Sequence, residues 1–289
     1  MSTFLRLSSR STGILLVVLS AFVFSLGGIF TKGVHSGAWD IIFWRGLFGT
    51  GFTLGYVWWR GSFNSDFFNI GKSGWAAAVV GASATAAYIP AFKLTTIANV
   101  SLIYAATPMI SALLAWCWIG ERASKAVLIA SLFSLLGVLI IVGGSVGGLH
   151  LTGDLLACYM VIAMGVGFVI YRSYPNTPAA GPSALSSILL MPFALAFGSP
   201  FTSSFSDILV MIAFGLTFAV ASITLAEGTK RLPVAEASLL SILELVFAPF
   251  LALAFFAEIP ALATFAGGAL ILASVLVTQV WPRKTVVVT

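Results

Sequence analysis

The chain has 289 residues, of which 60% are hydrophobic and only 8% are charged. Because about a quarter of the residues of a water-soluble domain are charged, this composition excludes a soluble globular protein and predicts a chain embedded in a lipid bilayer. The net charge is +5, but the 14 Lys and Arg residues are scattered between apolar runs, so we expect no nucleic-acid partner.

The N-terminal region predicts the first membrane span. Arg6 and Arg10 precede the apolar run 13–30, which is long enough to cross a bilayer and is not followed by a small-residue cleavage site, so we expect a helix and not a signal peptide. The two cysteines, Cys117 and Cys158, lie in apolar runs without CxxC spacing or a neighbouring His. We therefore expect no disulfide, no metal site and no cofactor.

Charged residues and Gly/Pro-rich breaks divide the chain into ten apolar runs, each near the roughly 20 residues that a transmembrane helix needs. The seventh run is short and contains Pro192. We predict transmembrane helices at 12–31, 40–60, 73–92, 97–119, 124–143, 152–171, 183–198, 207–227, 235–257 and 260–281.

One segment occurs twice. Residues 98–121 and 235–258 match at an offset of 137, at Ala98/Ala235, Ser101/Ser238, Leu102/Leu239, Leu114/Leu251, Ala115/Ala252 and Glu121/Glu258. This predicts two repeats, 1–148 and 149–289, and since each holds five spans, the second enters the membrane in the opposite sense. The expected fold class is an all-α integral membrane protein with ten transmembrane helices in two inverted five-helix repeats, which is typical of a secondary transporter.

The distribution of basic residues predicts the orientation. If the N-terminus is cytoplasmic, only Lys32 and Lys93 fall in external segments. The internal segments then contain Arg6, Arg10, Arg60, Lys72, Arg122, Lys125, Arg172, Lys230, Arg231, Arg283 and Lys284. The positive-inside rule therefore predicts that both termini are cytoplasmic.

Polar side chains form matching stripes on the fourth and ninth predicted helices, where we expect a central substrate cavity near the membrane midplane. The first stripe is Ser101, Tyr104 and Thr107, and its repeat equivalents are Ser238, Ser241 and Glu244. Each Ser or Thr has the alternative of bonding its own backbone. Pro108 and Pro249 are each interpreted either as a hinge or as a simple kink.

Glu244 is the strongest single candidate for a functional residue because it is a charge near the middle of a predicted span. Placing a charge there costs at least ~2.5 kcal/mol unless the group faces water, is protonated or is paired. Three roles remain open for it: a protonated carboxyl that only joins two helices, a contact with a substrate amino group, and a carrier of a proton as coupling ion.

Further residues on the third, sixth and eighth predicted helices are candidates for the wall of the cavity, although aromatic and Met side chains at helical spacing also fit a core or lipid-facing position. These are Tyr88, Tyr159, Met160, Met164 and Ser222. Arg45, one turn into the second span, is expected to extend outward or to pair, with contact to substrate at the external mouth as the alternative.

The segments WIGE, at 118–121, and ASLLSILELVFAPFLALAFFAE, at 237–258, resemble the EamA-type branch of the drug/metabolite transporter superfamily. The chain departs from the family pattern because Leu245 follows Glu244 where the family often has proline. Within that branch the chain is similar to YddG-type exporters of aromatic and other neutral amino acids. The resemblance implies a bacterial inner-membrane exporter with a central cavity between its halves.

Three classes of function compete. The favoured one is an exporter of small neutral or zwitterionic metabolites, which needs a small-molecule substrate and a lipid bilayer; anionic cargo is disfavoured because the cations lie near span ends. An intramembrane enzyme is disfavoured because His35 and His150 fall in predicted loops and the chain has neither GxSxG nor HExxH. An assembly protein would have no use for an internal polar stripe.

Overall fold

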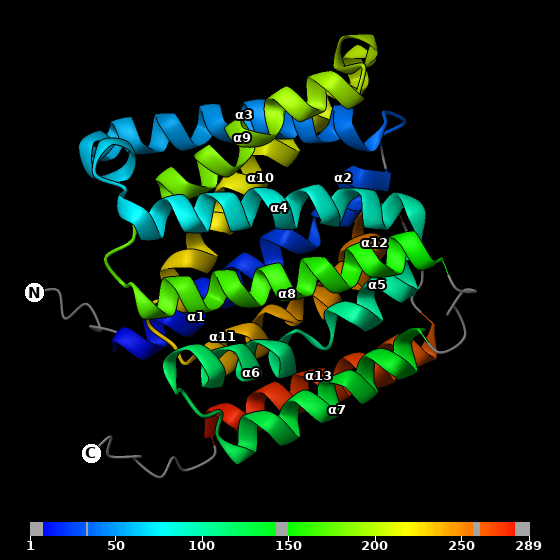
Figure 1. Cartoon of the computed structure of the whole chain (residues 1–289). Coiled ribbons are helices and arrows are strands. Elements are labelled where there is room, and N and C mark those ends of the chain that lie inside the picture. The colour runs from blue at the N-terminus through cyan, green and yellow to red at the C-terminus, as the bar shows by residue number, and fades with distance from the viewer. Residues whose placement is uncertain (1–7, 33, 143–149, 257–260, 281–289) are drawn as a thin grey trace, which may run out of the picture.

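The computed structural model describes residues 8–32, 34–142, 150–256 and 261–280, and these form only helices and short connections. Figure 1 shows the helices running side by side in one bundle. The helices are α1 (Ser9–Ser25), α2 (Gly27–Lys32), α3 (Ala38–Arg60), η1 (Asn64–Phe68), α4 (Gly71–Leu94), α5 (Ile97–Tyr104), α6 (Thr107–Ile119), α7 (Lys125–Val142), α8 (Leu151–Ser173), α9 (Ala180–Phe197), η2 (Pro200–Thr202), α10 (Phe205–Thr229), α11 (Val234–Ser241), α12 (Leu243–Phe256) and α13 (Leu262–Val280).

Nine stretches of the described chain are long and apolar enough to cross a membrane. Nine of the ten predicted spans correspond to these stretches, including the short seventh one, which is α9 with Pro192 inside it. The second predicted span is the 23-residue helix α3, whose charges at Asp40, Arg45 and Arg60 and whose glycines lower its hydropathy. The chain is therefore a multi-pass membrane protein.

Three of the predicted spans are each two helices, a feature that the apolar runs did not reveal. The first is interrupted at Leu26 between α1 and α2, the fourth at 105–106 between α5 and α6, and the ninth at Ile242 between α11 and α12. Hydropathy is insensitive to such breaks because the residues at them are themselves apolar.

Local chemistry explains the break between α5 and α6. The Thr107 hydroxyl donates to the Tyr104 carbonyl at 2.5 Å, and Pro108 occupies the first turn of α6. A proline there loses no helical hydrogen bond, because the first backbone N–H groups of a helix have no partner within it.

The break at Ile242, between α11 and α12, does not lie at a proline. Pro249 lies inside α12 and not at the break, so it does not cause the interruption at Ile242. At Ile242 the backbone N–H instead bonds to Leu239 three residues earlier, at 3.3 Å. The hydroxyls of Ser238 and Ser241 donate to the preceding carbonyls of Val234 and Ser238, an arrangement that bends helices.

The bundle has two edges and a middle. Helix α3 packs against α9 at one edge and α7 against α13 at the other, while the pairs α4 with α8 and α1 with α10 lie between them. At the α7–α13 crossing, glycines Gly137 and Gly267 bring the two backbones together, and the hydroxyls of Ser134 and Ser274 are 2.8 Å apart.

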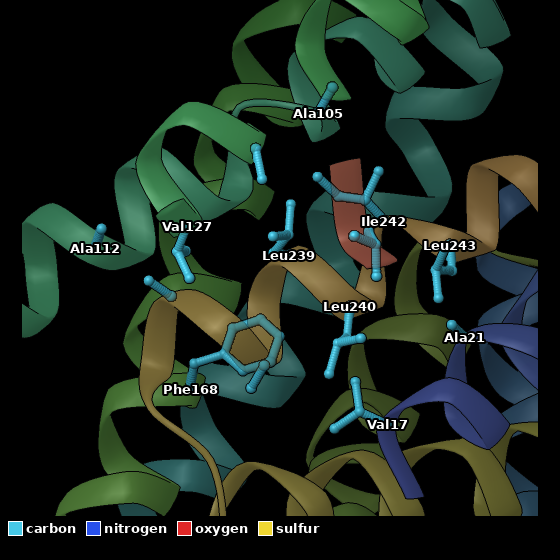
Figure 2. Packing of buried hydrophobic residues seen from close by; sticks show 14 of the residues in the cluster. Val17, Ala21, Ala105, Ala112, Val127, Phe168, Leu239, Leu240, Ile242 and Leu243 are labelled. Carbon is cyan, nitrogen blue, oxygen red and sulfur yellow. The ribbon is translucent and has the colours of Figure 1, made fainter. Parts of the chain in front are cut away.

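Helix α11 lies at the centre of the largest apolar cluster. All eight of its residues are buried. Leu239 and Leu240 of α11, together with Ile242, belong to one cluster with Val17 of α1 and Phe168 of α8, and Leu240 points toward Val17 (Figure 2). The end of α11 is thereby held at a defined place in the bundle, which positions the break that follows it.

Candidate functional site

The two helix breaks meet inside the bundle. Tyr104 is the last residue of α5 and Glu244 is the second residue of α12. The Tyr104 hydroxyl lies 3.3 Å from the carboxylate oxygen Oε2 of Glu244 and donates to it. No cation of the described chain forms an ion pair with Glu244. The phenol is therefore the hydrogen-bonding partner that the structure gives to this mid-span acid.

Aromatic and sulfur-containing side chains surround this pair. Tyr104 and Met160 are buried in one cluster, and Tyr88 packs against it with its ring 4.9 Å from that of Phe92. Ser241 is a further polar neighbour of the Tyr104 phenol. Glu244 is half-buried in this setting, so the surrounding helices do not cover its side chain completely.

The remaining members of the polar stripes are mostly occupied by their own backbone. Thr107, Ser238 and Ser241 are buried, and their hydroxyls donate to carbonyls three or four residues earlier, at 2.5 to 3.0 Å. Ser101 is half-buried on α5. The structure thus brings the stripes together at the breaks and uses three of their hydroxyls to shape the helices.

A cavity of about 150 Å³ lies between α4, α8, α9 and α10, and it is linked to the cluster of Tyr104 through Met164, which packs against that cluster. Met164 and Ser222 line it, as does Phe24 of α1. The hydroxyl of Ser222 donates to the Phe218 carbonyl and lies 2.5 Å from that of Ser183. An apolar cavity of this size can hold a benzene-sized group.

Tyr159 does not belong to the cavity wall, which corrects the sequence-based expectation. Its side chain is 48% exposed, like Leu155 and Ile162 on the same helix. Positions three or four residues apart share one face of a helix, so Tyr159 lies on the outward face of α8 while Met160 and Met164 point inward.

Arg45 is also placed differently from the expectation that it extends outward or pairs with an acid. It is 4% exposed, and its guanidinium carbon lies 4.0 Å from the centre of the Phe218 ring. It forms no ion pair with any acid of the described residues. Because α3 packs between α9 and α10, the side chain is enclosed by helices.

Ion pairs and hydrogen bonds tie the end of the bundle at which α1 begins and α13 ends, which we call the basic end. Glu121, just after α6, accepts from Arg172 at the end of α8, at 2.9 Å, and from the first backbone N–H of α11, at 2.7 Å. Arg10 of α1 donates to Glu236 and Gln279, each at 2.7 Å. Glu258, the repeat partner of Glu121, lies outside the described residues.

The cavity lies toward this basic end. Among its lining residues are Tyr171, next to Arg172, and Thr229, next to Lys230. Within the described ranges, no three or more His, Cys, Asp or Glu side chains lie close enough together to hold a metal. Around the two helix breaks, the described residues offer the Glu244 carboxylate, several hydroxyls and apolar side chains, which suit binding of a small molecule.

Comparison with known proteins decides the class. The profile of the EamA-like transporter family matches residues 11–143 and, a second time, residues 151–280. The chain belongs to the EamA-like transporter family. Since members of this family are transporters and not enzymes, the chain is a membrane transporter with a small-molecule substrate and a lipid environment.

A solved structure supports the fold of this EamA-like transporter. The crystal structure of another protein superposes with a TM-score of 0.83, covering 93% of this chain and 97% of that one at 21% identity. No curated protein matches the chain significantly.

Sequence reasoning missed two aromatic residues of the cavity wall and placed Arg45 nearer the membrane surface than the structure does. Phe24 and Phe218 line the cavity but look like ordinary apolar residues of a span. Arg45 carried a usable signal, namely its charge inside an apolar run, but its distance from the end of the span suggested an interfacial position.

Proposed function

We propose that this EamA-like transporter exports small neutral or zwitterionic metabolites, namely amino acids including aromatic ones, by alternating access through the central cavity. The observation that carries the proposal is the meeting of two broken helices at Tyr104 and Glu244. Transporters place substrate at such breaks, where helix ends expose polar groups near the midplane.

The repeat supports alternating access. We infer ten spans, with α3 as the tenth, in two inverted halves, 1–148 and 149–289. The breaks at Ala105 and Ile242 differ by the same 137 residues that relate the repeated segments. The contact of α4 with α8 likewise has a counterpart in that of α10 with α1. Two halves of this kind can rock about a shared site.

The chemistry of the interior supports the substrate class. Glu244, with no cation paired to it in the described residues, can hold a substrate ammonium or carry a coupling proton. The adjoining cavity has the size of an aromatic ring and is lined largely by apolar side chains, including Phe168 and Met164. Tyr88, Ser101 and Ser241 would complete the binding surface around the carboxylate.

The charge distribution supports the orientation. Arg10, Lys72, Arg172 and Lys230 lie toward the basic end, which we place in the cytoplasm together with both termini, in the inner (plasma) membrane. The cavity beside Tyr171 and Thr229 would then be the part of the pathway nearer the cytoplasm.

The test is transport by purified protein in proteoliposomes with a panel of labelled amino acids. We expect aromatic amino acids to be taken up and to be exchanged by unlabelled aromatic and other neutral amino acids, whereas protein-free liposomes show neither.

The mainly apolar wall around Phe24 and Phe218 favours a second candidate, an exporter of other amphipathic drugs or metabolites. Uptake of such compounds without uptake of any amino acid would select that candidate.

A further inference from the structure

Arg45 is a cation inside the bundle, and no acid among the described residues forms an ion pair with it. Its side chain is 4% exposed, and its Nε atom has no hydrogen-bond partner among the described residues. It lies seven residues into α3, about 10 Å from the start of that helix at 1.5 Å per residue. The salt bridges of the described chain all involve other residues.

The neighbours of Arg45 stabilise a cation only in part. The guanidinium carbon lies 4.0 Å from the ring centre of Phe218 and 5.5 Å from that of Phe214. Aromatic faces attract a guanidinium but leave its N–H donors unused. A buried charge normally keeps an anionic partner, so this position is complete only when an anion binds.

The transport pathway adjoins the guanidinium. Phe218 covers Arg45 on one side and lines the cavity on the other. Tyr88 of α4 is an electrostatic neighbour of both Arg45 and Glu244. A cation and an acid thus both lie within electrostatic range of one phenol, and a zwitterion carries the two charges that match them.

We propose that Arg45 binds the carboxylate of the substrate while Glu244 faces its ammonium group, with the Phe218 ring moving aside to admit the carboxylate. A guanidinium holds a carboxylate through two parallel N–H···O bonds. This assignment rests on the proposed function, because it names the recognition groups of the same site.

Three ligands that differ in one group each test the assignment by equilibrium binding to the purified full-length protein. They are phenylalanine, phenylalaninamide, which lacks the carboxylate, and 3-phenylpropionate, which lacks the amine. We expect wild-type protein to bind phenylalaninamide at least about tenfold more weakly than phenylalanine, because a site built for a polar group strongly rejects an analogue without it.

Substitution of Arg45 then assigns the effect to one residue. Arg45→Gln should weaken phenylalanine binding by about tenfold or more and leave phenylalaninamide within about twofold, so that the two ligands bind alike. Arg45→Lys should retain part of the preference, because it keeps the charge and loses the paired geometry. Arg60→Gln, the same change at the exposed end of α3, should alter neither ligand.

Each of the other outcomes of these binding experiments also retains or overturns the assignment of Arg45. Equal loss of both ligands in Arg45→Gln, or no loss, would mean that Arg45 is structural and would overturn the assignment. If Arg45→Gln does not fold, Arg45→Lys decides instead, because an unchanged preference for phenylalanine over its amide in that variant would overturn the assignment. Binding of 3-phenylpropionate but not phenylalanine, dependent on Arg45, would retain the assignment and reject amino-acid export. Failure of wild-type protein to bind either carboxylate would overturn it, even if the chain transports amines.

Discussion

Glu244 and Tyr104 show how one residue pair can hold a costly group inside a membrane protein. A charge at the centre of a span costs at least ~2.5 kcal/mol on insertion scales, and a hydrogen bond to a charged group contributes roughly 1.5–3 kcal/mol. The 3.3 Å bond from Tyr104 therefore offsets part of this cost, and the partial accessibility of Glu244 reduces it further. The Tyr104–Glu244 pair therefore keeps a polar group inside the membrane at a reduced free-energy cost.

The first prediction concerns the charge of that pair. Glu244→Gln keeps the size of the side chain and its contact with Tyr104 but cannot hold a charge or a proton. We expect transport to fall by about tenfold or more, as for other lost polar partners in a binding site, with a thermal midpoint close to that of wild type. The measurements are proteoliposome uptake and thermal unfolding of the purified protein.

The pH dependence of uptake separates the roles of Glu244. If the acid carries a proton, the wild-type pH profile flattens in Glu244→Gln; if it only contacts substrate, affinity falls while the profile keeps its shape. Glu227→Gln is the matched control, because Glu227 is already paired with Lys230 and Arg231 at 2.6 and 2.8 Å, and it should retain transport. Wild-type uptake and wild-type pH response in Glu244→Gln would exclude a functional role.

The second prediction compares two glycines on α8. A Cβ atom at Gly167 would meet no atom within 4 Å, and Gly167 lines the cavity, so Gly167→Leu should block transport and leave stability near wild type. At Gly165, a Cβ atom would lie 2.8 Å from Leu114, so Gly165→Leu should lower stability by roughly 1–3 kcal/mol. Uptake together with thermal unfolding checks both, and normal uptake by Gly167→Leu would remove this cavity from the pathway.

At the scale of elements, close backbone contact positions the helices that frame the site. Helices α7 and α13 cross where the glycines Gly137 and Gly267 face each other, and α11 is buried along its whole length. Glu121 then joins the ends of α6 and α8 to the start of α11, where the positive end of a helix dipole favours an acid. Small residues and one acid thus hold the broken helices in register.

The third prediction tests the α7–α13 crossing with two adjacent positions. A Cβ atom at Gly267 would meet the Gly137 carbonyl and lie 2.6 Å from Ile141, whereas one at Gly268 would lie 3.7 Å from Val246, an ordinary contact. Gly267→Ala should therefore destabilise the protein by roughly 1–3 kcal/mol, because packed backbones cannot yield easily. Gly268→Ala should be neutral or slightly stabilising. Equal thermal midpoints for the two variants would contradict the close crossing.

At the scale of the whole molecule, the two ends of the bundle carry different charges. The basic end has Arg10, Lys72, Arg172 and Lys230, while acids such as Asp154 and Asp207 begin helices at the opposite end. These acids serve the helices locally: Asp154 accepts from Thr95 at 2.7 Å and Asp207 from Ser36 at 2.9 Å. The asymmetry in cations is what the positive-inside rule uses.

The fourth prediction is the sidedness of the membrane protein. His35 and Ser65 are exposed and lie at opposite ends of α3. In a background without Cys117 and Cys158, His35→Cys should react with an impermeant thiol reagent added to intact cells, while Ser65→Cys should react only after the membrane is opened. The reverse pattern would place the basic end outside.

The EamA-like chain also shows which features could be predicted without a structure. Embedding in a bilayer, the approximate spans and the repeated segment follow from windows of local sequence, because transfer of about 20 apolar residues into lipid depends on those residues alone. Glu244 stood out for the same reason, as a charge within such a window.

Which side chains of each helix face the interior of the bundle was less predictable from the sequence. Tyr159 and Met160 are neighbours in sequence, yet one is 48% exposed and the other 1%. In lipid, apolar side chains are equally acceptable outside and inside the bundle, so hydropathy does not distinguish the two faces, and packing against neighbouring helices decides.

The sequence by itself determined the class of this protein, its membrane segments and the presence of one mid-span acid, since each depends on the cost of transferring a short segment from water to lipid. Only the tertiary structure decided where the helices break, that Tyr104 meets Glu244 across 140 positions, and that Arg45 lies over Phe218 inside the bundle. These features depend on contacts between distant segments, whose energies no local window contains.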